Sequence, residues 1–232
     1  MPTTPRARAR AQTMQDIVRI GREHLATDGA AALSLRAVAR DLGVVSSAVY
    51  RYVRSRDELL TLLVVDGYNA LGDAVDAALA DAPDDPKEQL LILARTVRAW
   101  AHAEPARYGL LFGTPVPGYD APADQTTTPG TRVITTMQFL FARAYERGML
   151  TAPDPLPRVS SALSGSFEEI RGQFELDLPD WLIARGVTLW ASLFGLVSGD
   201  VFDIYGTDTF ADRGELFELQ VEALLDMLGF SR

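Results

Sequence analysis

Apolar side chains recur along the chain at intervals of three and four residues, and this pattern predicts helices almost throughout. The N-terminal quarter carries such a pattern at Ile17, Gly21 and Leu25, which predicts a first helix that ends near Gly29. We find no convincing alternation of apolar and polar residues of the kind that is typical of a β-strand. The chain is therefore expected to be all-α.

Two short helices are predicted after this first one. Ser34 is a natural N-cap for the second helix, and Gly43 ends it where helices commonly terminate with a positive φ. A third helix is expected from Val45 or Ser46 to Val53. Two short helices joined by a glycine-containing turn are typical of a helix-turn-helix, whose second helix enters the major groove of DNA.

The third helix is expected to have two different faces. The face expected to pack inward consists of Val45, Ala48, Val49 and Tyr52. The outward face carries a hydroxyl group, a phenol and two guanidinium groups, which come from Ser47, Tyr50, Arg51 and Arg54. Arginine pairs with guanine or with phosphate, so this outward face is suited to DNA. A surface helix with solvated charges would show the same spacing, and the periodicity alone leaves that alternative open.

Charge is distributed unevenly along the chain. The whole sequence has a formal net charge of -9, yet residues 1–56 contain ten arginines and four acidic residues. Residues 57–232 contain 12 basic and 27 acidic residues. This asymmetry indicates a basic module that binds polyanions, attached to an acidic body that does not.

The remaining sequence predicts a long helix followed by a helical body. Ser55 can cap a fourth helix that stops at Pro83, and further helical stretches lie at residues 87–104, 105–113, 131–149, 157–175, 180–205 and 213–230. Residues 113–129 include four prolines and are expected to form a loop, either a lid over a ligand site or simply disordered. We expect a DNA-binding domain at 1–56, with a disordered basic arm at 1–12, and a ligand-binding and dimerisation domain at 57–232.

Several classes of protein are disfavoured by composition. The chain has no cysteine, which excludes disulfides and fits a reducing cytosol. The charge-free apolar run at 186–199 is shorter than the roughly 20 residues of a membrane-spanning helix, so no membrane partner is expected. His24 and His102 are the only histidines, and neither has a metal-ligand spacing. We therefore expect no catalytic residue, no metal and no cofactor.

The segment LSLRAVARDLGVVSSAVYRYVRSRDELL, at residues 33–60, resembles the TetR family of regulators. The positions that match the family pattern are Ser34, Val38, Ala39, Gly43, Val44, Val49, Tyr50, Tyr52 and Arg56. The resemblance covers about the first 60 residues well. Two shorter segments, WASLFGLVSGDVFDIYG at 190–206 and EPARYGLLFG at 104–113, resemble one subclass of the family's C-terminal domains.

The resemblance implies roles for several residues around the helix-turn-helix. Ser34 would cap the second helix and touch a phosphate, and Arg36 would reach a base or a phosphate. Tyr50 and Arg56 would clamp the DNA backbone. These roles are expectations carried from the family onto matching positions of this sequence.

Further contacts are implied for the third helix and for the N-terminus. Ser46, Ser47 and Arg51 would read or approach the groove. Tyr52 would either contact phosphate, as the family's frequent histidine does, or remain at the edge of the packed face. The arginines of residues 1–12 would either reach the minor groove or form a disordered counter-ionic tail.

The C-terminal body of a protein that resembles this family is expected to bind a small, largely hydrophobic effector. Such a pocket is mostly apolar with a few polar groups. The aromatic candidates for its lining are Trp100, Tyr108, Phe112, Phe139, Phe167, Phe174 and Trp190. His102 and Arg171 are possible polar contacts. Ordinary core packing is an alternative interpretation for each aromatic residue taken singly.

The function implied is that of a cytoplasmic, homodimeric transcription factor that binds double-stranded DNA at a palindromic operator. We expect a repressor that releases its operator when an effector binds. A ligand-dependent activator and a helical small-molecule-binding protein are the alternatives. The expected dimer interface lies at about 158–175 and 180–204, where Gly165, Gly172, Gly186, Gly195 and Gly199 allow either contact with a partner subunit or close packing within the chain.

Overall fold

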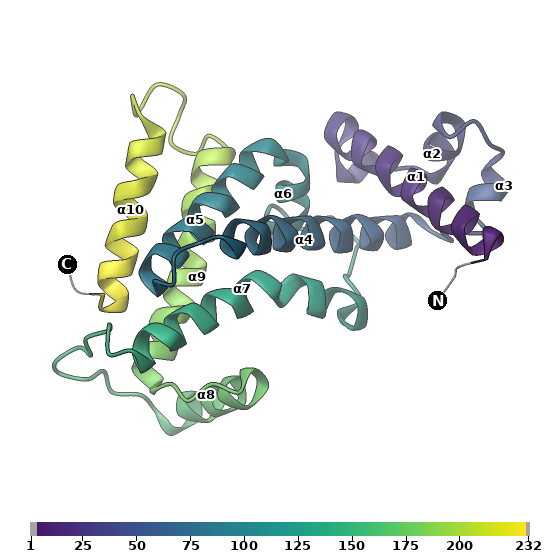
Figure 1. Ribbon diagram of the computed structural model, residues 1–232. Helices are drawn as coiled ribbons and strands as arrows, with labels where there is room; N and C mark the ends of the chain where they lie inside the picture. The colour runs from purple at the N-terminus through teal and green to yellow at the C-terminus, as the bar shows by residue number, and fades with distance from the viewer. Residues whose placement is uncertain (1–3, 231–232) are drawn as a thin grey trace. The chain divides into compact units, whose positions relative to one another are not determined.

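Helices make up the fold almost entirely. The computed structural model describes residues 4–230, and within them it contains ten α-helices, one short 3-10 helix and no strand (Figure 1). The expected all-α class is confirmed. An isolated bridge joins Leu150 to Phe230, near the C-terminal end of the described residues.

The elements follow one another with mostly short connections. In chain order they are α1 (Pro5–Asp28), η1 (Ala30–Ala32), α2 (Leu35–Asp41), α3 (Ser46–Val49), α4 (Arg56–Ala80), α5 (Pro86–Ala103), α6 (Pro105–Phe112), α7 (Ala123–Glu146), α8 (Ser161–Phe174), α9 (Asp180–Val201) and α10 (Arg213–Leu228). Most of these correspond to the predicted helices, because their apolar spacing was the signal used to predict them.

The chain divides into two compact units. Unit 1 contains the residues up to Ala70 together with Ala103–Gly130, and unit 2 contains Leu71–His102 and the residues from Thr131 onward. Helices α4 and α7 each contribute residues to both units. The two compact units do not test the functional boundary expected between residues 56 and 57. That boundary between a DNA-binding and a ligand-binding domain stays a prediction.

The core of unit 1 is built by the three N-terminal helices and the start of α4. Its buried members are Ile17, Ile20, Leu25, Leu33, Leu35, Val38, Ala39, Val49, Val53, Leu59, Leu60 and Leu63. Leu110 of α6 and Val116 and Tyr119 of the following loop pack against this core. The Tyr119 hydroxyl also lies 3.0 Å from the hydroxyl of Thr61 on α4. Unit 1 is therefore larger than a three-helix head.

The segment expected to be one loop from 113 to 129 is only partly a loop. Helix α7 begins at Ala123 and contains Pro129. Proline lacks the N–H that donates to the carbonyl four residues earlier, so its presence in the sequence favoured a break. Because Thr126 donates from both its backbone N–H and its hydroxyl to the carbonyl of Pro122, the first turn forms ahead of the proline. The prediction was wrong for residues 123–129.

The basic N-terminal segment is also more regular than expected. Helix α1 begins at Pro5, which is tolerated at a helix N-terminus because its missing N–H has no partner there. The Thr4 hydroxyl accepts a hydrogen bond from the backbone N–H of Ala7 at 3.2 Å. The expectation of a disordered arm was therefore wrong for residues 5–12. Residues 1–3 lie outside the described part of the chain.

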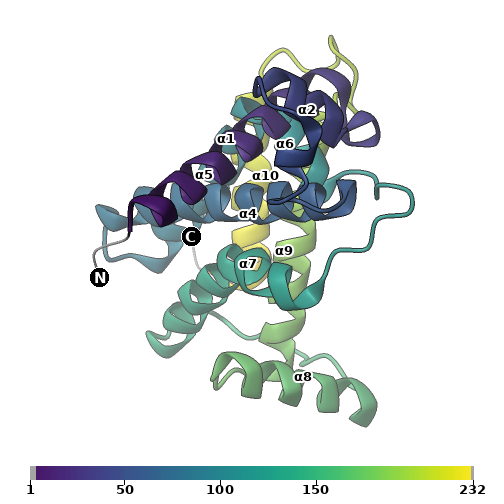
Figure 2. The ribbon, with the colours of Figure 1, turned by 90° about the vertical axis from the view of Figure 1, so that its right-hand side faces the viewer.

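Helix α9 forms the centre of unit 2. Ten of its residues are buried, including Leu182, Leu193 and Val197, and it packs against α10. Helix α8 lies across the N-terminal end of α9 in both views (Figures 1 and 2). By length and composition α9 could cross a membrane, but nearly half of its most apolar window is already buried inside the protein. It is a core helix, as the sequence predicted.

Candidate nucleic-acid interface

Helices α2 and α3 meet through a tight turn at Gly43. The φ of Gly43 is +72°, a region that favours glycine because a Cβ would be strained there. The N–H of Gly43 donates to the carbonyl of Arg40, and the N–H of Val44 donates to that of Ala39, each at 3.0 Å. These bonds close the C-terminus of α2 and direct the chain into α3. The helix-turn-helix outline predicted from sequence is present.

Helix α3 is shorter than predicted. Its α-helical part is Ser46–Val49, and the chain continues in turns to Tyr52. The N–H groups of Tyr52 and Val53 both donate to the carbonyl of Val49, at 2.8 and 3.0 Å. The last turn is thus tightened rather than lost, and it still orients the residues that follow Val49.

One member of the predicted inward face is misplaced. Val49 and Val53 are buried, but Val45 is 71% exposed. Val45 is the N-cap of α3 and has an extended backbone, so helical periodicity does not apply to its side chain. Ala48 and Tyr52 are half-buried. The inward face is therefore centred on Val49 and Val53.

The predicted outward face is exposed. Ser47, Tyr50, Arg51 and Arg54 all lie on the surface, as does Arg36 of α2. Within residues 4–230, the side chains of Arg36, Arg51 and Arg54 make no ion pair and no hydrogen bond. By contrast, most other arginines of the helices are paired with carboxylates or carbonyls, as Arg95 is with Glu218. Three guanidinium groups are thus left without a carboxylate on this surface, which we call the α2–α3 face.

The remaining predicted contact residues differ in their surroundings. Ser34 is the N-cap of α2 by position, but its side chain makes no capping hydrogen bond. Ser46 is half-buried at the start of α3. Arg56 donates to the carbonyls of Ala30 and Ala31 at 2.9 and 3.3 Å, so it braces the connection between α1 and α2. The family-derived expectation gave no hint of this bracing.

Tyr52 is covered by the N-terminal helix. The guanidinium of Arg10 lies 5.4 Å from the centre of the Tyr52 ring, which is a cation–π distance. Sequence reasoning missed this contact because the arm was expected to be disordered. Arg10 and Tyr52 therefore connect the start of α1 to the end of the helix-turn-helix.

A second missed contact joins α1 to α2. The Nε2 of His24 lies 2.6 Å from one carboxylate oxygen of Asp41. The other carboxylate oxygen of Asp41 accepts a hydrogen bond from Arg40. Hydrogen bonds from Arg40 and then from His24 hold the pKa of Asp41 below its usual value. His24 of α1 therefore contacts the C-terminal end of α2.

Helix α6 is anchored within unit 1 by a nearly buried cation. Arg107, only 6% exposed, donates to both the carbonyl and the carboxylate of Asp66 on α4, at 2.9 and 2.7 Å. Arg22 of α1 approaches the same carboxylate at 3.8 Å. Three helices therefore share one acidic side chain. The spacing of charged residues along the sequence offers no signal for this arrangement.

The seven aromatic residues predicted to line an effector pocket are divided between the two units. Tyr108 and Phe112 belong to unit 1, where the two rings lie 5.1 Å apart. The others belong to unit 2 and are Trp100, Phe139, Phe167, Phe174 and Trp190. Phe139 is largely exposed, whereas Phe167 is buried. Which of these aromatic residues line an effector pocket stays a prediction, because helical spacing does not specify which helices face one another.

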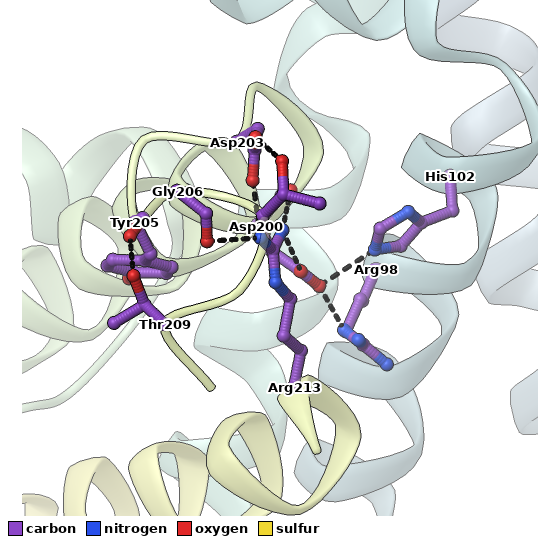
Figure 3. Close-up of polar contacts among 9 residues, drawn as sticks. Arg98, His102, Asp200, Asp203, Tyr205, Gly206, Thr209 and Arg213 are labelled. Atoms are coloured by element: carbon purple, nitrogen blue, oxygen red, sulfur yellow. Dashed lines mark hydrogen bonds and ion pairs between the residues drawn. The ribbon is translucent and has the colours of Figure 1, made fainter. Parts of the chain in front are cut away.

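The two polar residues expected near that pocket take part in ion pairs. His102 and Arg98 of α5 both reach a carboxylate oxygen of Asp200 on α9, each at 2.7 Å (Figure 3). Arg213 of α10 pairs with Asp203 and donates to the carbonyl of Gly206 at 2.8 Å. This arrangement closes the connection between α9 and α10.

Arg171, the second polar candidate, is bound close to α9. It pairs with Asp180 at the start of α9 and donates to the carbonyl of Leu178 at 2.7 Å. Its hydrogen bond and that of Ser164 keep the pKa of Asp180 below its usual value. Across residues 4–230, no group of three or more His, Asp or Glu side chains is arranged to hold a metal ion.

Comparisons with protein families agree with this geometry. A family model described as "Bacterial regulatory proteins, tetR family" matches residues 17–63. A second model, described as "Tetracyclin repressor-like, C-terminal domain", matches residues 90–224. The first match covers the helix-turn-helix, and the second covers most of the body.

Individual relatives agree along nearly the whole chain. The HTH-type transcriptional regulator Rv1816 of Mycobacterium tuberculosis H37Rv is 44% identical over 221 residues, covering 95% of this chain and 94% of the relative. The solved regulatory protein SCO4313 is 34% identical with a TM-score of 0.76, covering 96% of this chain and 100% of that one. A protein of unknown function from Rhodococcus sp. RHA1 shares the fold at 19% identity, with a TM-score of 0.69 and coverage of 93% and 94%.

Proposed function

The chain belongs to the TetR family of bacterial transcriptional regulators, and from this premise we propose that it is a homodimeric repressor that releases its operator when a small hydrophobic molecule binds. Regulators of this family bind DNA operators and small-molecule effectors, form dimers, and are not enzymes. Soluble regulators of this kind work where the chromosome is, so we propose a cytoplasmic location.

The observation that carries the docking proposal is the exposed, unpaired state of Arg36, Arg51 and Arg54 on the α2–α3 face. Arginine in such a setting can bind phosphate or guanine without first breaking an ion pair within the protein. Ser34, Ser46, Ser47 and Tyr50 supply the hydroxyl groups beside them. We propose that these side chains contact the major groove and its phosphates, with Tyr52 at the edge of the contact.

Arg56 has a supporting part in this proposal. Its hydrogen bonds to Ala30 and Ala31 hold η1 and the start of α2 in place. A clamp on the DNA backbone by Arg56 would require it to share its donors with phosphate. We propose that it positions the α2–α3 face and reaches DNA only secondarily.

The dimer is proposed to form through the exposed sides of α8 and α9. A Cβ added at Gly165, Gly172 or Gly195 would meet no atom within 4 Å, so these positions leave room for a second backbone. In contrast, a Cβ at Gly186 or Gly199 would lie 2.6 Å from Phe141 or Tyr205, so these two glycines are used for packing within the chain. Three of the five glycines named from the sequence thus support an interface between subunits.

Release is proposed to follow from a difference in effector affinity between two arrangements of the dimer. An effector shifts the equilibrium only by as much as it prefers one arrangement over the other. If the preferred arrangement separates the two α2–α3 faces by a distance other than the half-site spacing of about 34 Å or its multiple, DNA binding weakens.

Selection of bound sequences from random duplex DNA tests the DNA-binding part of this proposal. We expect recovery of a palindrome, because a two-fold dimer presents two identical heads. Recovery of no preferred sequence, or of a single unrepeated half-site, contradicts a dimeric operator complex. A promoter carrying the palindrome ahead of a reporter gene then separates repression from activation by the sign of the change.

A further inference from the structure

A small, partly open cavity lies in unit 2 between α7, α8 and α9. Its volume is about 20 Å³. Its walls come from α7, from α8 and the connection after it, and from α9, and they consist of Ile134, Gln138, Phe141, Ile170, Leu176, Leu178, Ile183, Gly186 and Val187. Eight of these nine residues present only apolar surface or backbone, and Gln138 is the exception.

Gln138 brings an unsatisfied polar atom to this place. Its Oε1 is buried and has no hydrogen-bond partner within residues 4–230. Buried polar atoms are nearly always hydrogen-bonded, because an unpaired one loses its interaction with water and gains nothing in return. An unpartnered acceptor on a residue that lines an otherwise apolar wall therefore calls for an explanation.

A trapped water is a poor explanation. The cavity could hold about one water molecule, but a buried water is stabilised by roughly three hydrogen bonds to the protein. This wall offers a single polar side chain. An apolar molecule with one donor group matches the lining better, since it satisfies the amide oxygen and buries the rest of its surface against the hydrocarbon.

We propose that this cavity is the start of the effector site, and that its ligand is a small apolar molecule whose hydroxyl or N–H group donates to Oε1 of Gln138. The proposal deepens the effector-binding function proposed above and rests on it. It also moves the site away from the seven aromatic residues named from the sequence. Apolar surface on the ligand supplies affinity, and the single hydrogen bond supplies selectivity.

The cavity must widen to accept such a ligand, and α8 is the wall that can move. A ring-sized ligand needs roughly 150 Å³, several times the present volume. Helix α8 has Phe167 as its one buried residue, whereas α9 has ten. Its polar ties to α9 converge on Asp180, which accepts from Ser164 at 2.8 Å and pairs with Arg171. An outward rotation of α8 about Asp180 opens the cavity without unfolding the core.

This location also links the ligand to the proposed dimer. Val187 lines the cavity and is at the same time exposed on α9, within the surface assigned to the partner subunit. A displaced α8 changes that surface directly. Ligand binding is thereby coupled to subunit arrangement, as the release mechanism requires.

The test compares phenol with toluene, which has a methyl group in place of the hydroxyl. Binding of each to the full-length protein is measured by thermal shift and by calorimetry, without DNA. We expect phenol to bind more tightly than toluene. In Gln138→Leu, phenol should lose about tenfold in affinity while toluene keeps its own, because only phenol uses the amide oxygen.

Two further variants keep the test decisive. Gln173→Leu changes an exposed glutamine of α8 and should leave both affinities unchanged. Ile170→Phe fills the cavity from α8 and should weaken both ligands. The proposal is overturned if neither probe binds, or if phenol and toluene respond alike to Gln138→Leu while that variant remains folded. Gln138→Leu should itself raise the melting temperature, since it removes an unpaired buried oxygen.

A result that rejects the proposed effector site can be distinguished from one that rejects the proposed regulatory function. Probe binding is measured without DNA, and operator binding is measured on the same variants without probe. Loss of the phenol preference with intact operator binding rejects only the site. Intact phenol selectivity without any sequence-specific DNA binding rejects the repressor instead.

Discussion

The α2–α3 face of unit 1 and the α8–α9 surface of unit 2 are both left uncovered, but their chemistry is opposite. The first exposes Arg36, Arg51 and Arg54. The second exposes apolar groups, with Leu163 48% and Val187 51% accessible. A cationic surface binds phosphates by releasing counterions and weakens with salt, whereas an apolar surface pairs by removing area from water. The two interactions proposed for this chain should thus respond differently to the same solution.

The largest expected effect comes from removing charge from the α2–α3 face. Arg36→Ala combined with Arg51→Ala removes four guanidinium groups from a dimer on its operator. Affinity should fall by at least about 10³-fold, because each specific arginine contact contributes roughly 1–3 kcal/mol. Fluorescence anisotropy with the selected operator measures the loss, and circular dichroism checks that the helices remain.

Arg147→Ala is the matched control, since it removes an exposed arginine of unit 2 that lies outside the proposed dimer interface. It should leave operator affinity nearly unchanged. The double variant should also show a shallower fall of affinity with salt, by about one unit of slope for each phosphate that the protein no longer neutralises. An unchanged slope together with full affinity would reject the α2–α3 face as the docking surface.

The next largest effect is a loss of stability, expected when the polar contacts between α5 and Asp200 of α9 are removed. Asp200 is 7% exposed and accepts from Arg98 and His102. Asp200→Asn leaves the Arg98 guanidinium without its counter-charge and should cost about 3 kcal/mol of unfolding free energy. Urea denaturation measures this loss. Asp84→Asn is the control, because Asp84 also binds two arginines but lies on the surface, where such pairs contribute little.

Acid should act on the same contacts in a predictable direction. Burial acts to raise the pKa of Asp200, but hydrogen bonds from His102 and Arg98 outweigh it and leave the pKa below its usual value. The carboxylate therefore stabilises the fold above the unfolded pKa of about 3.9, and this stabilisation is lost as pH falls through the lowered folded value. Asp200→Asn should lack this loss of stability below about pH 4.

Two glycines of α9 sharpen the contrast between packed and open surfaces. Gly186→Ala would bring a Cβ to 2.6 Å from the Phe141 ring, and such overpacking should cost about 2 kcal/mol. The Cβ added by Gly195→Ala lies within 4 Å of no other atom. This variant should stabilise the isolated subunit by up to about 1 kcal/mol, because alanine has a higher helix propensity than glycine. Sedimentation equilibrium should show a weaker dimer for Gly195→Ala, and an unchanged dimer would place the interface elsewhere.

The smallest effect is expected from the loop that packs on unit 1. Tyr119→Phe removes the 3.0 Å hydrogen bond between its hydroxyl and Thr61, which is nearly buried. Stability of unit 1 should fall by about 1 kcal/mol, measured as faster amide exchange in α4. Tyr145→Phe, an exposed tyrosine of α7, is the control and should change nothing. Equal exchange in both variants would mean that the loop does not hold α4.

Local patterns account for what could be predicted correctly before the fold was known. Apolar spacing defined most of the helices, and the segment from Ser34 to Arg56 carried the helix-turn-helix, because each of its elements is only a few residues long. Errors came where the backbone at a helix start departs from the simple rule that was applied to it. Thr126 starts α7 ahead of Pro129, and the extended backbone at Val45 turns its side chain outward.

The candidate DNA surface could also be predicted from a local pattern. Once Val49 and Val53 are buried, the periodicity of α3 determines which of its other side chains are exposed. The effector site could not. Its wall brings Gln138, Ile170 and Gly186 together from three helices, and nothing in their sequence positions indicates that they meet. Helical spacing tells which side of a helix is apolar but not which other helix covers it.

The amino-acid order by itself thus determined the helical class, the glycine turn and the basic head, because those depend on interactions between residues a few positions apart. Tertiary structure alone decided that Asp66 is shared by Arg107 and Arg22 and that the Gln138 oxygen is left without a partner. Such contacts join side chains tens of residues apart, and they exist only once packing has fixed which helices are neighbours.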